Sequence, residues 1–253
     1  MTKTNQQKVK DFLINNGVII VMFILVIYTG FTSDNFFTKN NFMNILMNMS
    51  SRLVIALGIA GCVITAGCDL SAGRMIGFGA CISGMLLQRM DYSGKFFPDM
   101  QPLNVFVVAL IAMLVCAAFG TVTGFFIAYL NVPPFIATLA MMEIVYGIGL
   151  IVTNATPLGG YVEQYTNVSN GKFLGINYLI WIAIIVAAIT WFIFNMTRHG
   201  KYMYAIGGNP QAAEVAGVPV KATLILIYMK AAAMYGLAGF MLGAKAGGAS
   251  VQT

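Results

Sequence analysis

The chain has very little charge for its length. Lys, Arg, Asp and Glu together make up only 9% of its 253 residues, whereas 59% are hydrophobic and the mean hydropathy is +0.82. A soluble domain usually has about 45–50% apolar residues and about 25% charged ones. The shortage of charge therefore excludes an ordinary soluble domain and predicts a protein that lies in a membrane.

The charges that are present do not indicate a polyanionic partner. Lys and Arg number 14 against 8 Asp and Glu, which gives a formal net charge of +6. No run of five or more basic residues exists, and the charges stand singly at the ends of apolar segments. This distribution is typical of anchoring and topology in a membrane. We therefore expect contact with membrane lipid and none with nucleic acid.

Residues and motifs for metal binding, ATP binding and catalysis are also scarce. His199 is the single histidine, and the four cysteines form no C-x-x-C pair, which excludes a zinc cluster. The sequence contains no G-x-x-x-x-G-K-[ST] or H-E-x-x-H motif, and no Ser/His/Asp set. We therefore predict no metal, no ATP site in this chain and no enzymatic activity. The cysteines are interpreted as small apolar residues; they are Cys62, Cys68, Cys81 and Cys116.

What the sequence has in abundance is apolar segments of about the length that crosses a bilayer. They predict an all-α integral membrane protein, a polytopic helix bundle that forms one transmembrane domain over residues 1–253. The polar stretch 33–51, rich in Asn and Met, is expected to be an interfacial helix or elbow. The seven segments are 17–31, 53–66, 75–90, 105–130, 135–152, 178–196 and 222–244.

Glycines recur at close spacings inside these segments. Small residues let helix backbones approach closely in lipid, so we predict tight helix packing at these positions. The alternative, that some of them allow helices to shift against each other, stays open. The glycines are Gly58, Gly61, Gly73, Gly77, Gly79, Gly120, Gly124, Gly236, Gly239 and Gly243.

The basic tail before the first segment predicts an uncleaved membrane helix with a cytoplasmic N-terminus. With that orientation, residues 92–103 and 154–177 lie outside. Residues 131–134 and 197–221 lie inside. This assignment depends on the tail, because lysines and arginines elsewhere are found on both predicted sides.

The longest polar stretch between late apolar segments, residues 197–221, contains the signals of a short helix. Asn209 is a strong N-cap residue, and Pro210 fits the first helical position. Residues 211–216 form the predicted helix, and Gly217 ends it. So short a helix is unstable alone, which indicates that it lies on a partner.

Three ordered motifs resemble those of one family. Gly207-Gly208-Asn209, Ala212-Ala213 and Gly217-Val218 resemble the coupling-helix loop of sugar permeases in ATP-binding-cassette (ABC) importers. Asp69-Leu70-Ser71, flanked by Gly67 and Gly73, resembles the Asp-Leu-Ser signature of that family. Residues 131–139 resemble its Asn-Val-x-Pro-Phe-Ile-x-Thr-Leu run. The similarity covers nearly all of the chain and is greatest to galactose/methyl-galactoside permeases, which residues 144–147 also fit.

The resemblance implies a non-catalytic subunit of a binding-protein-dependent importer in the bacterial cytoplasmic (inner) membrane, which carries galactose, methyl galactoside or a similar monosaccharide. It implies three protein partners: an ABC ATPase subunit that binds ATP and Mg²⁺, a second permease copy (a homodimer), and an extracytoplasmic sugar-binding protein. Relatives continue with further helices, so we expect the chain to be C-terminally truncated relative to the family. The cytoplasmic coupling loop, within 197–221, would act through Gly208, Asn209, Pro210, Ala212, Ala213, Glu214 and Gly217.

Asp69 lies in a glycine-flanked break between segments 53–66 and 75–90, which either cross the membrane or dip in and return. Unwound backbone at such a break can bind a polar solute. Alternatively, the Asp69 carboxylate caps the next helix. We keep both interpretations open. The residues considered for a path or gate are Asp69, Ser71, Arg74, which is a possible partner of Asp69, Asn131 and Pro134.

Two further charges, Glu143 and Lys230, lie inside apolar segments, where ionisable residues are costly. Neither belongs to a matched motif, so the resemblance implies no role for them, and a contact between the two stays open. Glu143 and Asp69 are also the only candidate carboxylates for the alternative function, a stand-alone ion-coupled transporter or channel. The capped helix predicted over residues 211–216 and the absence of an internal inverted repeat are evidence against that alternative.

Overall fold

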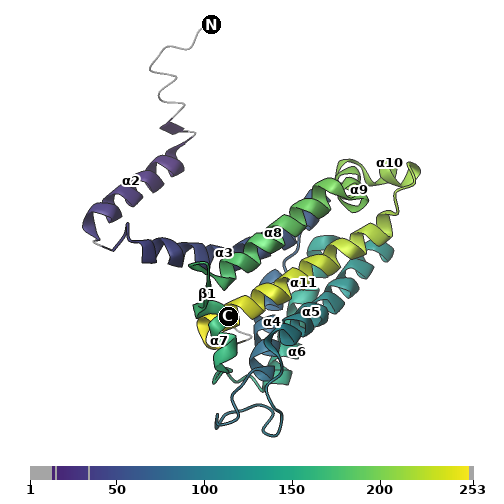
Figure 1. Cartoon of the computed structure of the whole chain (residues 1–253). Coiled ribbons are helices and arrows are strands. Elements are labelled where there is room, and N and C mark those ends of the chain that lie inside the picture. Colours follow the sequence, from purple (N-terminus) through teal and green to yellow (C-terminus); the bar gives the residue numbers. More distant parts are fainter. Residues whose placement is uncertain (1–12, 15, 34, 251–253) are drawn as a thin grey trace. The chain divides into compact units, whose positions relative to one another are not determined.

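The computed structural model describes residues 13–14, 16–33 and 35–250. Over these residues the chain is helical apart from loops and one short hairpin (Figure 1). It divides into two units, of which the first ends at Leu46 and the second begins at Met47. The predicted all-α fold class is confirmed, and each unit is described by itself.

The first unit contains α2 (Gly17–Thr32), the first predicted apolar segment. A helix of 16 residues is about 24 Å long, somewhat less than the about 30 Å of a hydrocarbon core. After a short irregular stretch, the Thr38 hydroxyl accepts a hydrogen bond from the Asn41 N–H (3.3 Å). This is the pattern of an N-cap at the start of the next helix.

That next helix, α3 (Lys39–Ile64), corrects one expectation. The Asn- and Met-rich part of residues 33–51 does not form a separate interfacial element. It is continuous with the following apolar residues in one helix of 26 residues. No glycine or proline interrupts residues 39–57, and Leu, Met and Lys are good helix formers, so nothing local ends the helix there.

The remaining predicted segments each coincide with a helix. Among the described residues, five helices are long and apolar enough to cross a membrane, and α4 (Ala72–Leu86) and α2 are shorter. The prediction of seven apolar helical segments is thus confirmed. The five long helices are α3, α5 (Val105–Tyr129), α6 (Pro134–Thr153), α8 (Tyr178–Met196) and α11 (Val220–Ala246).

Helix α11 is the central helix of the second unit, and it packs against α5 and α4. Glycines make the close approach possible. A Cβ atom added at Gly236 would lie 2.5 Å from the Ala112 carbonyl oxygen of α5. Gly120 meets the Tyr228 backbone and Gly239 meets the Ile76 backbone in the same way. The predicted tight packing is confirmed at these three glycines, whereas a Cβ atom added at Gly73, another glycine of the predicted set, would meet no atom within 4 Å.

The helices α5 and α11 are antiparallel and therefore define two ends of this unit. At one end, the Lys221 ammonium lies 5.2 Å from the ring centroid of Tyr129, next to the α5–α6 turn. We call this the α10 end, because α9 (Arg198–Gly208) and α10 (Pro210–Val215) lie there. At the other end, Tyr165 of α7 (Glu163–Asn170) donates a hydrogen bond to the Phe240 carbonyl (2.7 Å).

This second end, the α7 end, also contains the hairpin of β1 (Lys172–Phe173) and β2 (Ile176–Asn177), in which Lys172 pairs with Asn177. The loops are grouped as predicted. Residues 92–103 and 154–177 lie at the α7 end, and residues 131–134 and 197–221 lie at the α10 end (Figure 1).

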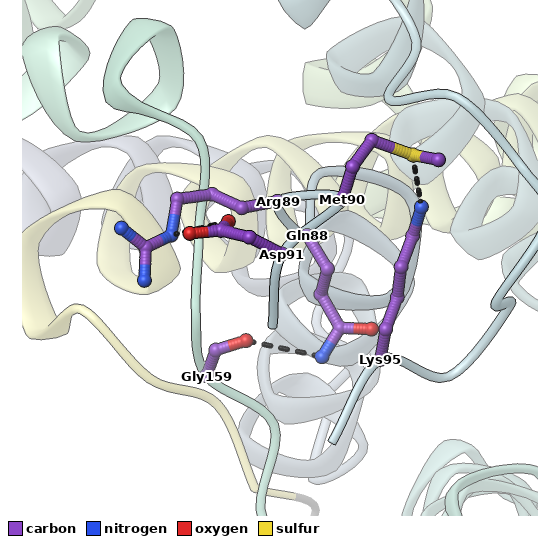
Figure 2. A network of polar contacts seen from close by, with 6 residues as sticks. All are labelled: Gln88, Arg89, Met90, Asp91, Lys95 and Gly159. Carbon is purple, nitrogen blue, oxygen red and sulfur yellow. Dashed lines mark hydrogen bonds and ion pairs between the residues drawn. The ribbon is translucent and has the colours of Figure 1, made fainter. Parts of the chain in front are cut away.

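The two loops at the α7 end are fastened to each other through Gln88, which is buried. Its side-chain N–H donates to the Gly159 carbonyl (3.0 Å), and its side-chain oxygen accepts from the Phe96 N–H (2.7 Å). Figure 2 shows the Gln88–Gly159 hydrogen bond beside the exposed Arg89–Asp91 ion pair, whose closest atoms are 3.6 Å apart. An exposed pair of this kind adds little stability. The tie depends instead on the buried amide and on two backbone hydrogen bonds, from the Arg89 N–H to the Gly160 carbonyl (2.8 Å) and from the Val162 N–H to the Leu87 carbonyl (2.9 Å).

Candidate functional site

The predicted coupling helix is present as α10, with the predicted signals at both ends. The Asn209 side-chain oxygen accepts from the Ala212 N–H (3.0 Å), and Pro210 is the first helical residue. Gly217 has φ +82°, a left-handed conformation that suits glycine, and the Val218 N–H returns to the Ala213 carbonyl (3.0 Å). The start and the end of this helix follow from local sequence.

The two sides of α10 differ in exposure. Ala213 is only 5% exposed because it faces back onto the chain, whereas Val215 is 91% exposed. Ala212 and Glu214 are exposed as well. Ala213 thus packs against this chain, and its part in binding an ATPase stays a prediction. Sequence reasoning missed Val215, although an apolar residue on an otherwise polar loop was a usable signal.

Helix α9 connects α10 to the membrane helices. Its N-cap, Thr197, accepts a hydrogen bond from the Gly200 N–H (3.4 Å). Near its other end, the Gly207 backbone approaches the carbonyl oxygen of Ile64, the last residue of α3, so closely that no side chain would fit there. Helix α9 thus stands between α10 and the end of α3.

The break between α3 and α4 begins at this contact. Ala66 has φ +56°, and the Gly67 N–H bonds to the Cys62 carbonyl (2.9 Å), which ends α3 in the manner of a Schellman motif. The Tyr228 hydroxyl donates to the Cys68 carbonyl (3.3 Å). The break thus lies against the middle part of α11. From there α4 runs to the α7 end, where Gln88 follows it in the chain.

Asp69 binds the break to its surroundings through both carboxylate oxygens. Oδ1 accepts from the Ser71 N–H (3.0 Å) and the Ser71 hydroxyl (2.6 Å). Oδ2 accepts from the Tyr235 hydroxyl of α11 (3.1 Å). The contacts to Ser71 form an Asx turn immediately before α4, whose N-cap residue is Ser71. The contact to Tyr235 adds a tie between the break and the central helix that sequence reasoning did not foresee.

The other path candidates do not all gather here. Arg74 is the third residue of α4, just beyond the break. Its guanidinium carbon lies 4.2 Å from the ring centroid of Tyr146 on α6. Asn131, with φ +53°, and Pro134, the first residue of α6, form the turn at the α10 end. Asn tolerates the left-handed conformation and Pro suits a helix start, so both have a local structural role.

The two membrane charges without an assigned role lie apart. Lys230 of α11 lines a cavity of about 20 Å³ together with Leu57, Thr190 and Met203, from α3, α8 and α9. Glu143 lies on an exposed side of α6, and the structure gives it no hydrogen bond or ion pair within the described residues. The contact between Glu143 and Lys230 that the sequence left open is therefore absent.

His199 of α9 lies near Lys230. Burial, and then the positive charge of Lys230, lower the pKa of His199 to about 4. Its Nε2 atom is buried and has no hydrogen-bond partner in the part of the chain that the structure describes. The imidazole is therefore neutral at neutral pH. Over the same residues, no group of three or more His, Cys, Asp and Glu side chains could hold a metal ion.

Comparisons with known proteins agree on one family. The chain is 38% identical to the galactose/methyl galactoside import permease protein MglC of Escherichia coli K12, over 99% of this chain and 76% of that protein. It is 39% identical to the Haemophilus influenzae MglC, with the same coverage. It is 30% identical to the ribose import permease protein RbsC of E. coli K12, over 92% of this chain and 70% of that protein. No solved structure matches the chain.

The family model for the branched-chain amino acid transport system / permease component matches residues 41–253. This range includes the Asp69 break, the α5–α6 turn, α10 and all five long apolar helices except the first two residues of α3. Together with the identity to the import permeases, the match shows that the chain belongs to this family of multi-pass membrane permeases.

Proposed function

We propose that the chain is the membrane-spanning subunit of a binding-protein-dependent ABC importer that carries galactose or methyl galactoside across the bacterial inner membrane. The observation that carries the proposal is α10, a capped helix that presents an exposed face on a loop between two membrane helices. The names of the relatives, all import permeases for these sugars or for ribose, support the substrate class. The chain itself is a non-catalytic subunit.

An importer of this kind works with an ATPase on the cytoplasmic side and a binding protein on the outer side. We therefore assign the α10 end to the cytoplasm and the α7 end to the outside. The basic N-terminal tail supports the same orientation under the positive-inside rule. ATP and Mg²⁺ are bound by the ATPase, and the binding protein delivers the sugar to the loops around Gln88 and α7.

The structure suggests how ATP binding in the partner reaches the membrane. The exposed face of α10, with Ala212, Glu214 and Val215, seats in the ATPase, while Ala213 keeps α10 attached to the chain. Helix α9 then transmits movement to Ile64 at the end of α3. The ATPase biases the permease because its two states hold α10 differently, and only such a difference in affinity can shift a conformational equilibrium.

The permease acts as a homodimer in this proposal. Leu70 and Gly73, at the break, are exposed at the level of the middle of α11. Irregular backbone at membrane depth is tolerated only where protein covers it or where it lines an aqueous cavity. A second copy of the permease, placed against this side, would provide both the cover and the other wall of the path.

The alternative of a stand-alone ion-coupled transporter is not retained. It would use Asp69 and Glu143 as ion ligands. The Asp69 oxygens accept hydrogen bonds from Ser71 and Tyr235, and Glu143 is on a different helix without a second carboxylate partner. The relatives are named as import permeases, which favours the ABC reading.

The proposal is tested by purifying the permease with its ATPase and adding the binding protein loaded with one sugar at a time. We expect galactose and methyl galactoside to raise the ATPase rate of the complex in lipid above the rate with unloaded binding protein. Ribose is the comparison sugar, because a ribose permease is among the relatives. Stimulation by ribose alone would show that the substrate is ribose and not galactose. Stimulation by no sugar would contradict an importer for monosaccharides.

A further inference from the structure

Helix α6 has one buried and one exposed side. Ala137, Met141 and Val145 are buried and face α4 and α5, the helices against which α6 packs. The exposed side carries apolar residues, among them Ile136 (56% exposed) and Ile151 (77% exposed). An exposed apolar side is suited to contact with lipid. One residue on this side is charged.

That residue is Glu143. It lies near the middle of α6, about equally far from Pro134 and Thr153. Its side chain is exposed, and no described residue gives it a hydrogen bond or an ion pair. A charged side chain at the centre of a bilayer costs about 2.5–3.5 kcal/mol on insertion scales, and much more in simulations. We therefore expect Glu143 to face water or another polar group in the working protein.

Other polar groups lie at the same level. Tyr146 follows Glu143 by three positions, which places both on neighbouring parts of the helix surface. Tyr146 is half-buried, and the Arg74 guanidinium lies over its ring at 4.2 Å. Next to Arg74, the Met75 carbonyl lies 3.7 Å from the Cys116 sulfur in the middle of α5. These two contacts place Arg74 and Tyr146 near the middle of the membrane helices.

The backbone beside Arg74 is also accessible. Gly73 is exposed, and a Cβ atom added there would meet no atom within 4 Å. We call Gly73, Arg74, Glu143 and Tyr146 the α6 patch. It comprises a carboxylate and an aromatic ring one turn apart on α6, the guanidinium that lies over that ring, and the open backbone next to this guanidinium on α4.

We infer that the α6 patch lines the solute path and contacts the sugar during passage. This inference rests on the proposed function, because it takes a monosaccharide as the solute. The Glu143 carboxylate accepts hydrogen bonds from sugar hydroxyls, and the Arg74 guanidinium donates to hydroxyl oxygens. The Tyr146 ring, held by Arg74, offers an apolar face to the C–H side of the sugar ring.

The chemistry fits a neutral polyol better than an ion. The patch contains one charge of each sign, so it offers both acceptors and donors without a large net field. A few convergent polar groups in apolar surroundings are usual for a small-molecule site. Transport also requires that binding be weak enough for release, which an open patch of four residues satisfies better than an enclosed pocket.

The test asks whether Glu143 faces water. In a background with the four native cysteines replaced by alanine, we would introduce Glu143→Cys in the full permease with its ATPase. The control is Ile189→Cys, because Ile189 is 52% exposed near the middle of α8, a helix that packs on α7 and α9. The probe is a small, membrane-impermeant methanethiosulfonate reagent, which reacts with thiolates in water.

We expect the Glu143→Cys variant to react at least about tenfold faster than Ile189→Cys, because a thiol in hydrocarbon does not ionise. D-galactose delivered by the binding protein should slow the reaction. Equal, slow reaction of both variants would overturn the inference. So would slow reaction combined with efficient cross-linking of Glu143→Cys to itself by a short bis-thiol reagent, because that result places Glu143 in a dry contact between two copies.

Uptake gives a second, independent readout. Glu143→Leu suits a membrane helix and should not impair insertion or assembly with the ATPase. We expect it to lower galactose uptake by at least about tenfold, whereas Glu143→Gln, which keeps an acceptor and the shape, should lower uptake less. Wild-type uptake by Glu143→Leu would overturn the inference. If the wild type carried no sugar, the proposed function would fail, yet thiol labelling would still decide whether the patch is wet.

Discussion

Asp69 shows how one residue can satisfy two interpretations that the sequence left open. Its contacts with Ser71 hold the residue at the start of α4, as a local cap would, and its contact with Tyr235 binds the break to α11. Because Asp69 also lies half-buried where the chain is unwound, a movement of α11 or of α3 would disturb these same bonds. The cap and a part in the conformational change are therefore compatible.

Asp69→Asn and Asp69→Ala separate these contributions. Asn caps about as well as Asp and keeps the acceptor for Ser71, whereas Ala loses it at a cost of about 0.5–2 kcal/mol. We expect sugar uptake to fall severalfold with Asn, because the charged acceptor for Tyr235 is lost, and further with Ala. Membrane content and ATPase co-purification should be normal in the Asn variant. Full uptake by the Asp69→Asn variant would show that Asp69 has only a local capping role.

His199 makes a prediction about pH. Its pKa in the folded protein is lowered from 6.5 to about 4 by burial and by Lys230, so the unfolded chain binds more protons between these values. The contribution of neutral His199 to stability is thus fully present above pH 6.5 and is lost as the pH falls towards 4. Thermal unfolding of the permease in detergent should occur at lower temperature at pH 4.5 than at pH 7.

His199→Asn is the matched variant for this prediction, because Asn is polar and does not titrate. We expect a smaller difference in unfolding temperature between pH 4.5 and pH 7 in the variant than in the wild type. An unchanged difference would show that other groups cause the pH dependence.

At the scale of elements, the sequence predicted best where the signals are local. The start and end of α10 depend on Asn209, Pro210 and Gly217, and all three act on their own backbone. The burial of Ala213 could not be predicted in the same way, because it depends on how α10 packs against α9 and α11. The continuity of α3 was missed because Asn and Met were read as interfacial, although neither interrupts a helix.

The two sides of α10 give a prediction for this element. Val215→Arg changes an exposed side chain, so the permease should fold normally and lose ATPase co-purification and uptake. Ala213→Arg forces a charge into a buried site, so it should also lower the unfolding temperature. Co-purification and thermal unfolding are measured on both variants. Normal ATPase binding by Val215→Arg would show that the partner does not use this face.

At the scale of the whole molecule, the sequence predicted the number of apolar segments and the grouping of loops, because hydropathy and segment order determine both. It could not predict which distant residues meet. Asn131 and Pro134 were grouped with Asp69 but form the turn at the α10 end, and Glu143 and Lys230 lie on different sides of the bundle. The Tyr235–Asp69 and Arg74–Tyr146 contacts likewise depend on tertiary packing.

The two ends of the second unit allow a test of orientation. Leu174, in the hairpin turn, is 78% exposed at the α7 end, and Val215 is 91% exposed at the α10 end. In a background without the native cysteines, Leu174→Cys should react with an impermeant thiol reagent in intact cells. Val215→Cys should react only after the membrane is opened. Reaction of both from the same side would refute the assigned topology.

The most direct measurement is galactose accumulation in liposomes that contain the permease and its ATPase, with binding protein outside and ATP inside. We expect galactose to accumulate above the outside concentration with ATP, and not with a non-hydrolysable analogue or without binding protein. Val215→Arg should abolish accumulation in the same preparation. Galactose entry that only equilibrates across the membrane, or that is the same with and without ATP, would contradict an importer driven through α10.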